Sequence, residues 1–279
     1  MTDLSPPAAP ASAPKPPGNL RLLHLTDLHF LAGAGERMLG VDTEQSFVDT
    51  LRAALASGPP PDLVLLTGDL VQDPVPSAYR RLRERLRGLP CPAYCLPGNH
   101  DDPRLIEQHL VGAGVLFQSN LVVGGWQIIC LDSTIPRLPF GRLGGEQLRL
   151  LEDLLGRHPE CHALIALHHH AVPSGSAWMD TMVLEDADRL FGLLAAHPRV
   201  RAVVCGHVHQ AIDRTHQGVR MIATPSTCFQ FKPLQADFAL DALPPGYRWI
   251  ELGADGGIAT TMGRGREIPE GLDFSSRGY

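Results

Sequence analysis

Five short polar segments of this chain carry side chains that bind transition metals. They are Asp27-Leu28-His29, Gly68-Asp69, Gly98-Asn99-His100-Asp101, His168-His169-His170 and Gly206-His207-Val208-His209. Mixed carboxylate, amide and imidazole ligands favour Mn, Fe or Zn over Ca or Mg. Two dications about 3.5–4 Å apart need a bridging ligand, and a carboxylate has two oxygens for this purpose. The segments therefore predict a dinuclear metal site with hydrolase chemistry.

The spacing inside the segments indicates how the ligands divide between two metals. Asp27 and His29 alternate at the expected end of a strand, so their side chains point to the same side and can reach one metal. His207 and His209 repeat this spacing and can divide between the two ions. Asp69 is the natural bridging carboxylate.

The remaining ligands of the second metal are expected from an amide and an imidazole. Asn99 supplies a neutral amide oxygen, and one histidine of His168, His169 and His170 completes the shell. Two ligating carboxylates and two dications together leave a formal charge of roughly +2. A bound cation is often the largest local charge in its site. Such a site can hold a phosphate ester even in an acidic protein.

The polar segments follow runs of β-type apolar residues, so each is expected where a strand gives way to a loop. Open α/β sheets place their sites at these strand ends. Helices are expected at 43–56, 77–87, 145–157 and 186–196, and strands at 20–25, 62–66, 93–96, 127–131, 163–167, 200–204, 221–224, 247–252 and 258–262. The alternation predicts an α/β fold, and the scarcity of helices late in the chain favours a second sheet packed on the first.

Composition narrows the class of protein. The chain has 279 residues, of which 44% are hydrophobic and 19% charged, as in an ordinary globular enzyme with one domain. The net charge of -6 argues against a nucleic-acid partner, because phosphate-backbone affinity needs clustered Lys and Arg. Six dispersed cysteines are expected to be reduced, buried thiols.

The expected organisation is a flexible Pro/Ala-rich leader at 1–18, one domain at 19–262 and an irregular C-terminal tail at 263–279. The leader lacks the basic and apolar regions of a signal peptide. No segment supplies the roughly 20 apolar residues needed to span a bilayer. We therefore expect a cytoplasmic protein without a membrane partner, either a monomer or a homodimer.

In their order, the motifs D-x-H, G-D, G-N-H-D, H and G-H-x-H resemble the signature of calcineurin-like metallophosphoesterases, from residue 27 to residue 209. Further stretches extend the likeness to about 20–262 and are similar to the class III cyclic-nucleotide phosphodiesterases of bacteria. These stretches are Leu39-Gly40-Val41, Leu96-Pro97-Gly98-Asn99-His100-Asp101, Leu167-His168-His169-His170, residues 223–233 and Pro245-Gly246-Tyr247-Arg248.

The resemblance implies a four-layer α/β/β/α sandwich with the metals at strand ends. It also implies hydrolysis of 3′,5′-cyclic AMP to 5′-AMP by in-line attack of a hydroxide that bridges two Mn, Fe or Zn ions. Carried over by motif, one metal is held by Asp27, His29, Asp69 and His209, and the other by Asp69, Asn99, His169 and His207.

The resemblance also assigns the acid of the reaction and chooses within the histidine triplet. His100 matches the general acid that protonates the ribose 3′-oxygen, with Asp101 orienting it. His169 is chosen because the family's ligand usually precedes a proline by two positions. Here that position is Ala171, which leaves His168 and His170 as alternatives.

Other readings of the same residues stay open. The metals would contact the phosphate and not the leaving group. A phosphodiesterase of broad specificity, for 2′,3′-cyclic nucleotides, glycerophosphodiesters or lipid-linked diphosphates, is therefore an alternative. A non-catalytic scaffold of the same fold is another, although the complete ligand set and His100 weigh against it. Trp178 and Asp180, and also residues 224–233, either line the substrate cleft or only pack against it or the sheet.

Overall fold

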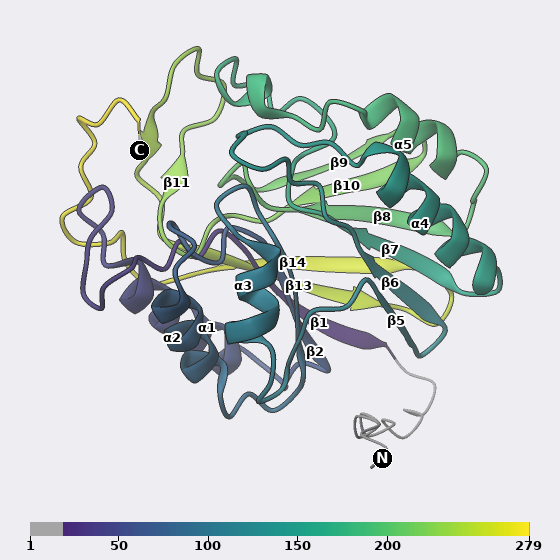
Figure 1. Ribbon diagram of the computed structural model, residues 1–279, viewed down its shortest axis with the longest axis horizontal. Coiled ribbons are helices and arrows are strands. Elements are labelled where there is room, and N and C mark those ends of the chain that lie inside the picture. Colours follow the sequence, from purple (N-terminus) through teal and green to yellow (C-terminus); the bar gives the residue numbers. More distant parts are fainter. Residues whose placement is uncertain (1–18, 279) are drawn as a thin grey trace, which may run out of the picture.

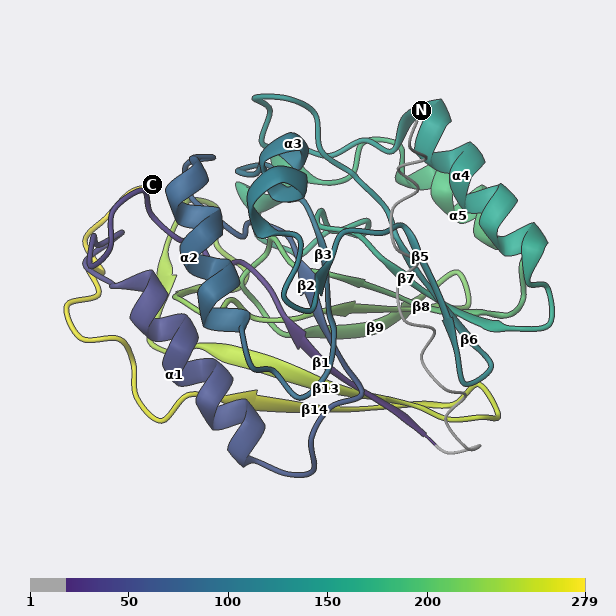
Figure 2. The same ribbon diagram turned by 60° about the horizontal axis from the view of Figure 1, so that its bottom comes forward.

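The computed structural model describes residues 19–278. Two six-stranded sheets pack face to face, and helices cover the outer face of each (Figure 1). Helices α1, Thr43–Ala56, and α2, Pro76–Leu86, lie on the first sheet, whereas α4, Gly144–Arg157, and α5, Ala187–Leu194, lie on the second (Figure 2). The four-layer α/β/β/α arrangement expected from the sequence is confirmed.

The first sheet has a parallel centre and an antiparallel edge. Its order is β14 (Ile258–Arg264), β13 (Gly246–Leu252), β1 (Leu20–Leu25), β2 (Leu63–Thr67), β3 (Ala93–Leu96) and β4 (Val115–Leu116). Strands β1 to β4 run parallel, and β13 pairs antiparallel with β1. Since β1, β2 and β3 run in the same direction, their carboxyl ends lie at the same edge of the sheet.

The second sheet repeats this plan from the middle of the chain. Its order is β5 (Asn120–Val123), β6 (Trp126–Cys130), β7 (His162–Ala166), β8 (Val200–Cys205), β10 (Val219–Ala223) and β9 (Ile212–His216). Strands β6, β7, β8 and β10 are parallel, and the two edge strands are antiparallel to their neighbours. The ends of β7 and β8 therefore lie beside each other.

Three apolar layers hold the sheets and helices together. Leu22, Leu65, Leu164 and Val204 belong to the layer between the two sheets, and separate layers lie beneath the helices on either side. All five residues of β2 are buried, as expected of a strand covered on both faces. His24 is also buried between the sheets, where its ring nitrogens lie 2.7 Å from the hydroxyls of Thr67 and Thr224.

The structure adds elements that the sequence did not indicate. Short strands β4 and β5 and the polar edge strand β9 were not expected, and β14 continues to Arg264, two residues beyond the expected end of the domain at 262. A further two-stranded pair joins β11, Gln230–Phe231, to β12, Leu240–Asp241. Within residues 19–278, no helix is both long and apolar enough to cross a membrane.

Candidate metal centre

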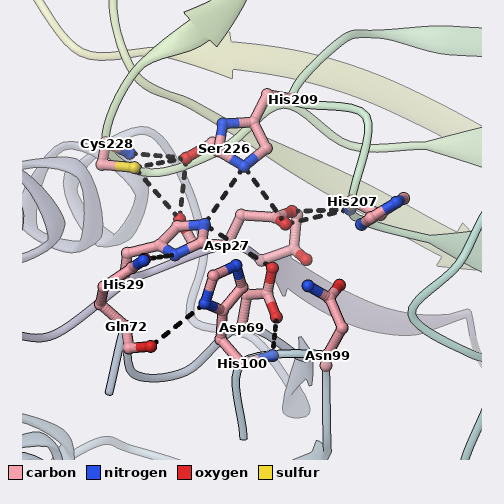
Figure 3. Close-up of polar contacts among 12 residues, drawn as sticks. Asp27, His29, Asp69, Gln72, Asn99, His100, His207, His209, Ser226 and Cys228 are labelled. Atoms are coloured by element: carbon pink, nitrogen blue, oxygen red, sulfur yellow. Dashed lines mark hydrogen bonds and ion pairs between the residues drawn. The ribbon is translucent and has the colours of Figure 1, made fainter. Parts of the chain in front are cut away.

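The five polar segments predicted from the sequence meet where β1, β2, β3, β7 and β8 end, so both sheets contribute to one centre. Figure 3 shows Asp27, His29, Asp69, Asn99, His207 and His209, which come from the loops after β1, β2, β3 and β8. Five of the predicted ligands have a left-handed backbone: Asp27 (φ 53), His29 (φ 50), Asp69 (φ 47), His207 (φ 69) and His209 (φ 47). This conformation is uncommon outside glycine, and clusters of such residues occur at functional sites.

Glycines let these loops approach one another closely. A Cβ on Gly68, whose φ is +91, would lie 2.6 Å from the backbone nitrogen of Gly98 and 2.6 Å from Nδ1 of His168. A Cβ on Gly206 would lie 2.6 Å from a carboxylate oxygen of Asp27. The glycines of G-D and G-H-x-H are therefore needed because the backbone passes directly beside the side chains of the centre.

The first group of ligands gathers around His29 and His209. Nε2 of His29 lies 3.3 Å from Nε2 of His209 and 3.7 Å from Oδ2 of Asp69. Nε2 of His209 lies 3.4 Å from Oδ1 of Asp27. Asp27, His29 and His209 are completely buried, and their ligand atoms form one of the groups able to hold a metal ion.

The second group gathers around His168. Its Nε2 lies 3.1 Å from Oδ1 of Asn99, 3.3 Å from Oδ2 of Asp69 and 3.2 Å from Nδ1 of His207. The same oxygen of Asp69 lies near His29 of the first group. Asp69 thus stands between the two groups, in the position that a bridging carboxylate requires.

The ring orientations in the first group fit a metal ion. Nδ1 of His209 lies 2.9 Å from the backbone carbonyl of Phe229, and Nδ1 of His29 lies 2.8 Å from Oε1 of Gln72. Since both oxygens accept, both Nδ1 atoms donate, and both Nε2 atoms present lone pairs across 3.3 Å. Such hydrogen bonds typically orient metal-binding histidines, and a cation between the two nitrogens removes the repulsion of their lone pairs.

Charges within the centre also suit cations. Burial would raise the pKa of Asp27, but His209 beside it holds that pKa below its usual value. Burial likewise opposes ionisation of Asp69, whereas His168 and His100 hold its pKa well below the usual range. Burial lowers the pKa of His29 to about 3. At neutral pH these two carboxylates are ionised and His29 is neutral, the states in which they ligate metals.

The histidine triplet divides among three environments. His168 contacts Asn99 and Asp69, as described above, and its Nδ1 lies 2.8 Å from the carbonyl of Thr67. His169, the residue chosen from the sequence, directs Nδ1 to the hydroxyl of Ser133 at 2.8 Å, although its ring stays 4.8 Å from that of His207. His170 turns toward Asp180, with Nε2 at 3.4 Å from Oδ1. The geometry favours the alternative that the sequence left open, His168, as the ligand beside Asn99.

His100 lies at the edge of the centre, half-buried, with Nδ1 at 3.1 Å from the backbone carbonyl of Gln72. Its backbone amide donates to Oδ1 of Asp69 at 3.1 Å. The contact with the Gln72 carbonyl orients the ring of His100. The sequence predicted this orienting role for Asp101, whose hydrogen bonds go to the loops after β2 and β3.

Asp101 joins the loops that carry the ligands. Its carboxylate accepts hydrogen bonds from the backbone amides of Leu70, Val71 and Gly98 and from the hydroxyl of Tyr79. Burial and the nearby charge of Asp69 raise the pKa of Asp101 to about 7. Asp101 therefore fixes the loop after β2 against the loop after β3, and affects His100 through the backbone.

A pocket of about 470 Å³ opens beside the centre. Its lining combines residues of the metal centre, an apolar wall and two arginines: Asn99, His100, Arg137, Leu138, Pro139, Trp178, Met179, Met182, His207, Phe238, Arg277 and Gly278. Trp178 both lines this pocket and packs edge-on against Phe231 and Phe238, with ring centroids 5.0 and 5.3 Å apart. Both readings of Trp178 from the sequence are therefore compatible with its position.

Residues 224–233 support the ligands and do not line this pocket. The ring of Phe231 stacks on His209 at 4.1 Å, and the carbonyl of Phe229 receives the His209 hydrogen bond. The hydroxyl of Ser226 donates to the backbone carbonyl of Asp27 at 2.8 Å. The segment therefore contacts two predicted ligands, Asp27 and His209.

Sequence reasoning missed residues that orient the histidines and most of those that line the pocket, including its two arginines. Gln72 and Ser133 hold ring nitrogens of His29 and His169. Gln72 follows Asp69 by three residues, so a polar side chain close behind G-D was the one available signal. Arg137 and Arg277 had no local signal, because distant segments bring them to the pocket.

The sequence matches the family described as "Calcineurin-like phosphoesterase" over residues 20–211. It is 40% identical over 261 residues to the 3′,5′-cyclic adenosine monophosphate phosphodiesterase CpdA of Escherichia coli K12, covering 93% of this chain and 95% of that protein. It is 38% identical to the Pseudomonas aeruginosa protein of the same name, covering 96% and 98%. The fold resembles a dimetal phosphatase from Danio rerio, with a TM-score of 0.56, 14% identity and coverage of 88% and 99%.

The match extends across all five polar segments, and the similarity to the bacterial proteins continues through almost the whole chain. The structural likeness adds the fold alone. The order of the motifs, the convergence of their side chains and these matches lead to one assignment. The chain belongs to the calcineurin-like phosphoesterase family.

Proposed function

We propose that this chain hydrolyses 3′,5′-cyclic AMP to 5′-AMP as a metal-dependent phosphodiesterase. The observation that carries the proposal is the position of Asp69 between two groups of ligands, beside a pocket large enough for a nucleotide. The bacterial relatives at 38–40% identity are named for the same reaction.

Two transition-metal ions, Mn, Fe or Zn, fit the two groups of ligands. Asp27, His29 and His209 would hold one ion and Asn99, His168 and His207 the other, with Asp69 shared. His169 stays the second choice within the triplet because it also lies near His207. When bound, the ions would stabilise negative charge on the phosphoryl oxygens and lower the pKa of water.

His100 is the residue that we assign to the leaving group. With Nδ1 donating to the carbonyl of Gln72, a protonated His100 ring carries its second proton on Nε2, and this proton can pass to the ribose 3′-oxygen as its bond to phosphorus breaks. An alkoxide is a poor leaving group, and general acid catalysis contributes about 10²–10⁴-fold. His100 lines the pocket together with Asn99 and is only half-buried, so a substrate can reach it.

The nucleoside is expected against the apolar side of the pocket. Leu138, Trp178 and Phe238 offer flat or apolar surface on which a purine can pack. The volume of the pocket, about 470 Å³, lies within the range of small-molecule sites. This wall supports a cyclic nucleotide over a small alkyl diester.

Location in the cytoplasm is part of the proposal. All six cysteines are free thiols in the structure, and five of them are buried. Free thiols are typical of reducing compartments, whereas disulfides accumulate in secreted proteins.

The test is steady-state hydrolysis of 3′,5′-cyclic AMP, 2′,3′-cyclic AMP and bis-p-nitrophenyl phosphate by Mn-loaded protein, with Asn99→Ala as the control. The proposal predicts the highest kcat/KM for 3′,5′-cyclic AMP, lost in the control. Higher kcat/KM for both other diesters would favour a broad phosphodiesterase. Equal, negligible rates for the wild type and His100→Ala would favour a non-catalytic scaffold.

A further inference from the structure

The C-terminal tail, residues 265–278, extends to the pocket beside the metal centre. Arg277 and Gly278 line this pocket together with Asn99 and His100. In sequence, almost the whole chain lies between Asp27, the first predicted ligand, and Arg277. Figure 1 shows the tail, in yellow, passing beside the early loop drawn in purple and ending near β11.

The tail is anchored by the stretch Leu39-Gly40-Val41. Leu272 is only 8% exposed and belongs to the same apolar cluster as Val41. The backbone amide of Asp273 donates to the carbonyl of Leu39 at 2.9 Å. Gly40 has φ +82, and a Cβ at this position would lie 1.9 Å from the carbonyl oxygen of Gly271. Glycine at position 40 is therefore required for the tail to dock.

Beyond this anchor the tail is held by its own turns. Oδ1 of Asp273 accepts hydrogen bonds from the amide and hydroxyl of Ser275 at 3.0 and 2.6 Å. The amide of Ser276 donates to the carbonyl of Asp273 at 3.2 Å, and its hydroxyl donates to the carbonyl of Gly278 at 2.7 Å. These bonds restrict the segment that carries Arg277, which reduces the entropy lost when its side chain binds a ligand.

The charges that line the pocket are all positive apart from its histidines. Arg137 comes from the loop between β6 and α4 and Arg277 from the tail, and no Asp or Glu is among the lining residues. Within residues 19–278, neither guanidinium group makes a hydrogen bond or ion pair with another residue. Two such groups at a pocket in a chain of net charge -6 favour an anion as the occupant.

We propose that the docked tail forms one wall of the substrate site and that Arg277, aided by Arg137, binds the phosphate of the substrate. A guanidinium group is suited to this task because its planar donors match two phosphoryl oxygens. The identity of the substrate as a cyclic nucleotide rests on the function proposed above, whereas the binding of a phosphodiester anion does not.

A contact made equally in the bound substrate and in the transition state changes KM and leaves kcat alone. The test therefore compares KM and kcat of the wild type with those of Arg277→Ala, Arg277→Lys and Arg266→Ala, on 3′,5′-cyclic AMP and on bis-p-nitrophenyl phosphate. Arg266 is the matched control, because it belongs to the same tail but lines a different groove beside α1.

Arg277→Ala is expected to raise KM about tenfold with kcat within about twofold, and Arg277→Lys is expected to raise KM less. Arg266→Ala is expected to behave as the wild type. Gly40→Ala, which undocks the tail, should raise KM as Arg277→Ala does. Bound metal is measured for every variant, to show that the centre is intact.

An unchanged KM in Arg277→Ala, or the same change in Arg266→Ala, would overturn the proposal. A loss of kcat in Arg277→Ala at constant KM would overturn it as well. If the wild type hydrolyses bis-p-nitrophenyl phosphate but not 3′,5′-cyclic AMP, the proposed function fails, and the KM for bis-p-nitrophenyl phosphate still decides the role of Arg277.

Discussion

The side-chain oxygen of Asn99 lies 3.1 Å from Nε2 of His168, the first histidine of the triplet. Asp69 approaches the same nitrogen at 3.3 Å. Nδ1 of His169 contacts Ser133, and its Nε2 is buried without a hydrogen-bond partner within residues 19–278. His168 is the histidine beside both Asn99 and Asp69, and we therefore propose it as the ligand in preference to His169.

Replacing the two histidines separately tests this division. His168→Ala should reduce the bound metal from two ions to about one and lower kcat by at least about 10³-fold, because it removes a ligand. His169→Ala should keep both ions and lower kcat about 10–100-fold, the usual effect of replacing a residue that supports a ligand. Metal analysis and steady-state rates provide the measurements. Loss of an ion in His169→Ala alone would return the ligand role to His169.

Metal binding should release a proton from His168. Burial opposes protonation of this ring, but the carboxylate of Asp69 prevails and raises the pKa to about 9 in the metal-free protein. Since a ligating imidazole is neutral, loading at about pH 7.5 should release about one proton more in the wild type than in His168→Ala. Calorimetry in buffers of different ionisation enthalpy measures this number, and equal release by both proteins would contradict the assignment.

The raised pKa of His168 also determines how this residue affects the stability of the metal-free protein. The pKa of His168 is raised from 6.5 to about 9, so the folded state binds its proton more tightly than the unfolded state does. The stabilisation is complete below pH 6.5 and is lost as the pH rises through about 9. Denaturant unfolding of the metal-free wild type should show this loss relative to His168→Ala. A difference that does not depend on pH would contradict it.

Gly68 should be sensitive to substitution for a reason beyond its backbone conformation. Gly68→Ala places a Cβ 2.6 Å from Gly98 and from His168, so metal and activity should be lost. Gly88 has a similar φ of +87 with nothing within 4 Å, and Gly88→Ala should cost only about 1 kcal/mol of stability. Rates and denaturant unfolding compare them. Full activity in Gly68→Ala would show that the loops can separate without loss of the centre.

Asp101 should act mainly on stability and loop position. Asp101→Ala leaves three backbone donors and Tyr79 without their acceptor, and each unsatisfied buried donor costs about 1–3 kcal/mol. We expect a loss of at least about 4 kcal/mol in the free energy of unfolding, against about 1 kcal/mol for Tyr79→Phe. Denaturant titration measures both. Normal stability with a large loss of kcat would instead support a direct action of Asp101 on His100.

The sequence predicted the parts of the centre that depend on local pattern. Asp27, Asp69 and His207 each follow an apolar strand, and strand ends of a parallel sheet meet by geometry. The choice between His168 and His169 could not be predicted, because it depends on which way the chain turns after β7. Neither could the docking of Leu272 near Leu39, which joins residues far apart in the chain.

Elements without an apolar pattern were also missed. Strand β9 has three exposed residues among five, and β4 has only two residues. Their pairing follows from the neighbouring strands, since an edge strand needs only one partner. These edges do not carry ligands, so their omission left the predicted centre unaffected.

A competition between two cyclic nucleotides in one reaction shows which of them this chain hydrolyses. Mn-loaded protein is given equal concentrations of 3′,5′-cyclic AMP and 2′,3′-cyclic AMP, and the products are separated and identified. We expect 5′-AMP as the main product, and we expect its formation to cease in Asn99→Ala. Formation of 2′- or 3′-AMP with 3′,5′-cyclic AMP left intact would contradict the proposed function.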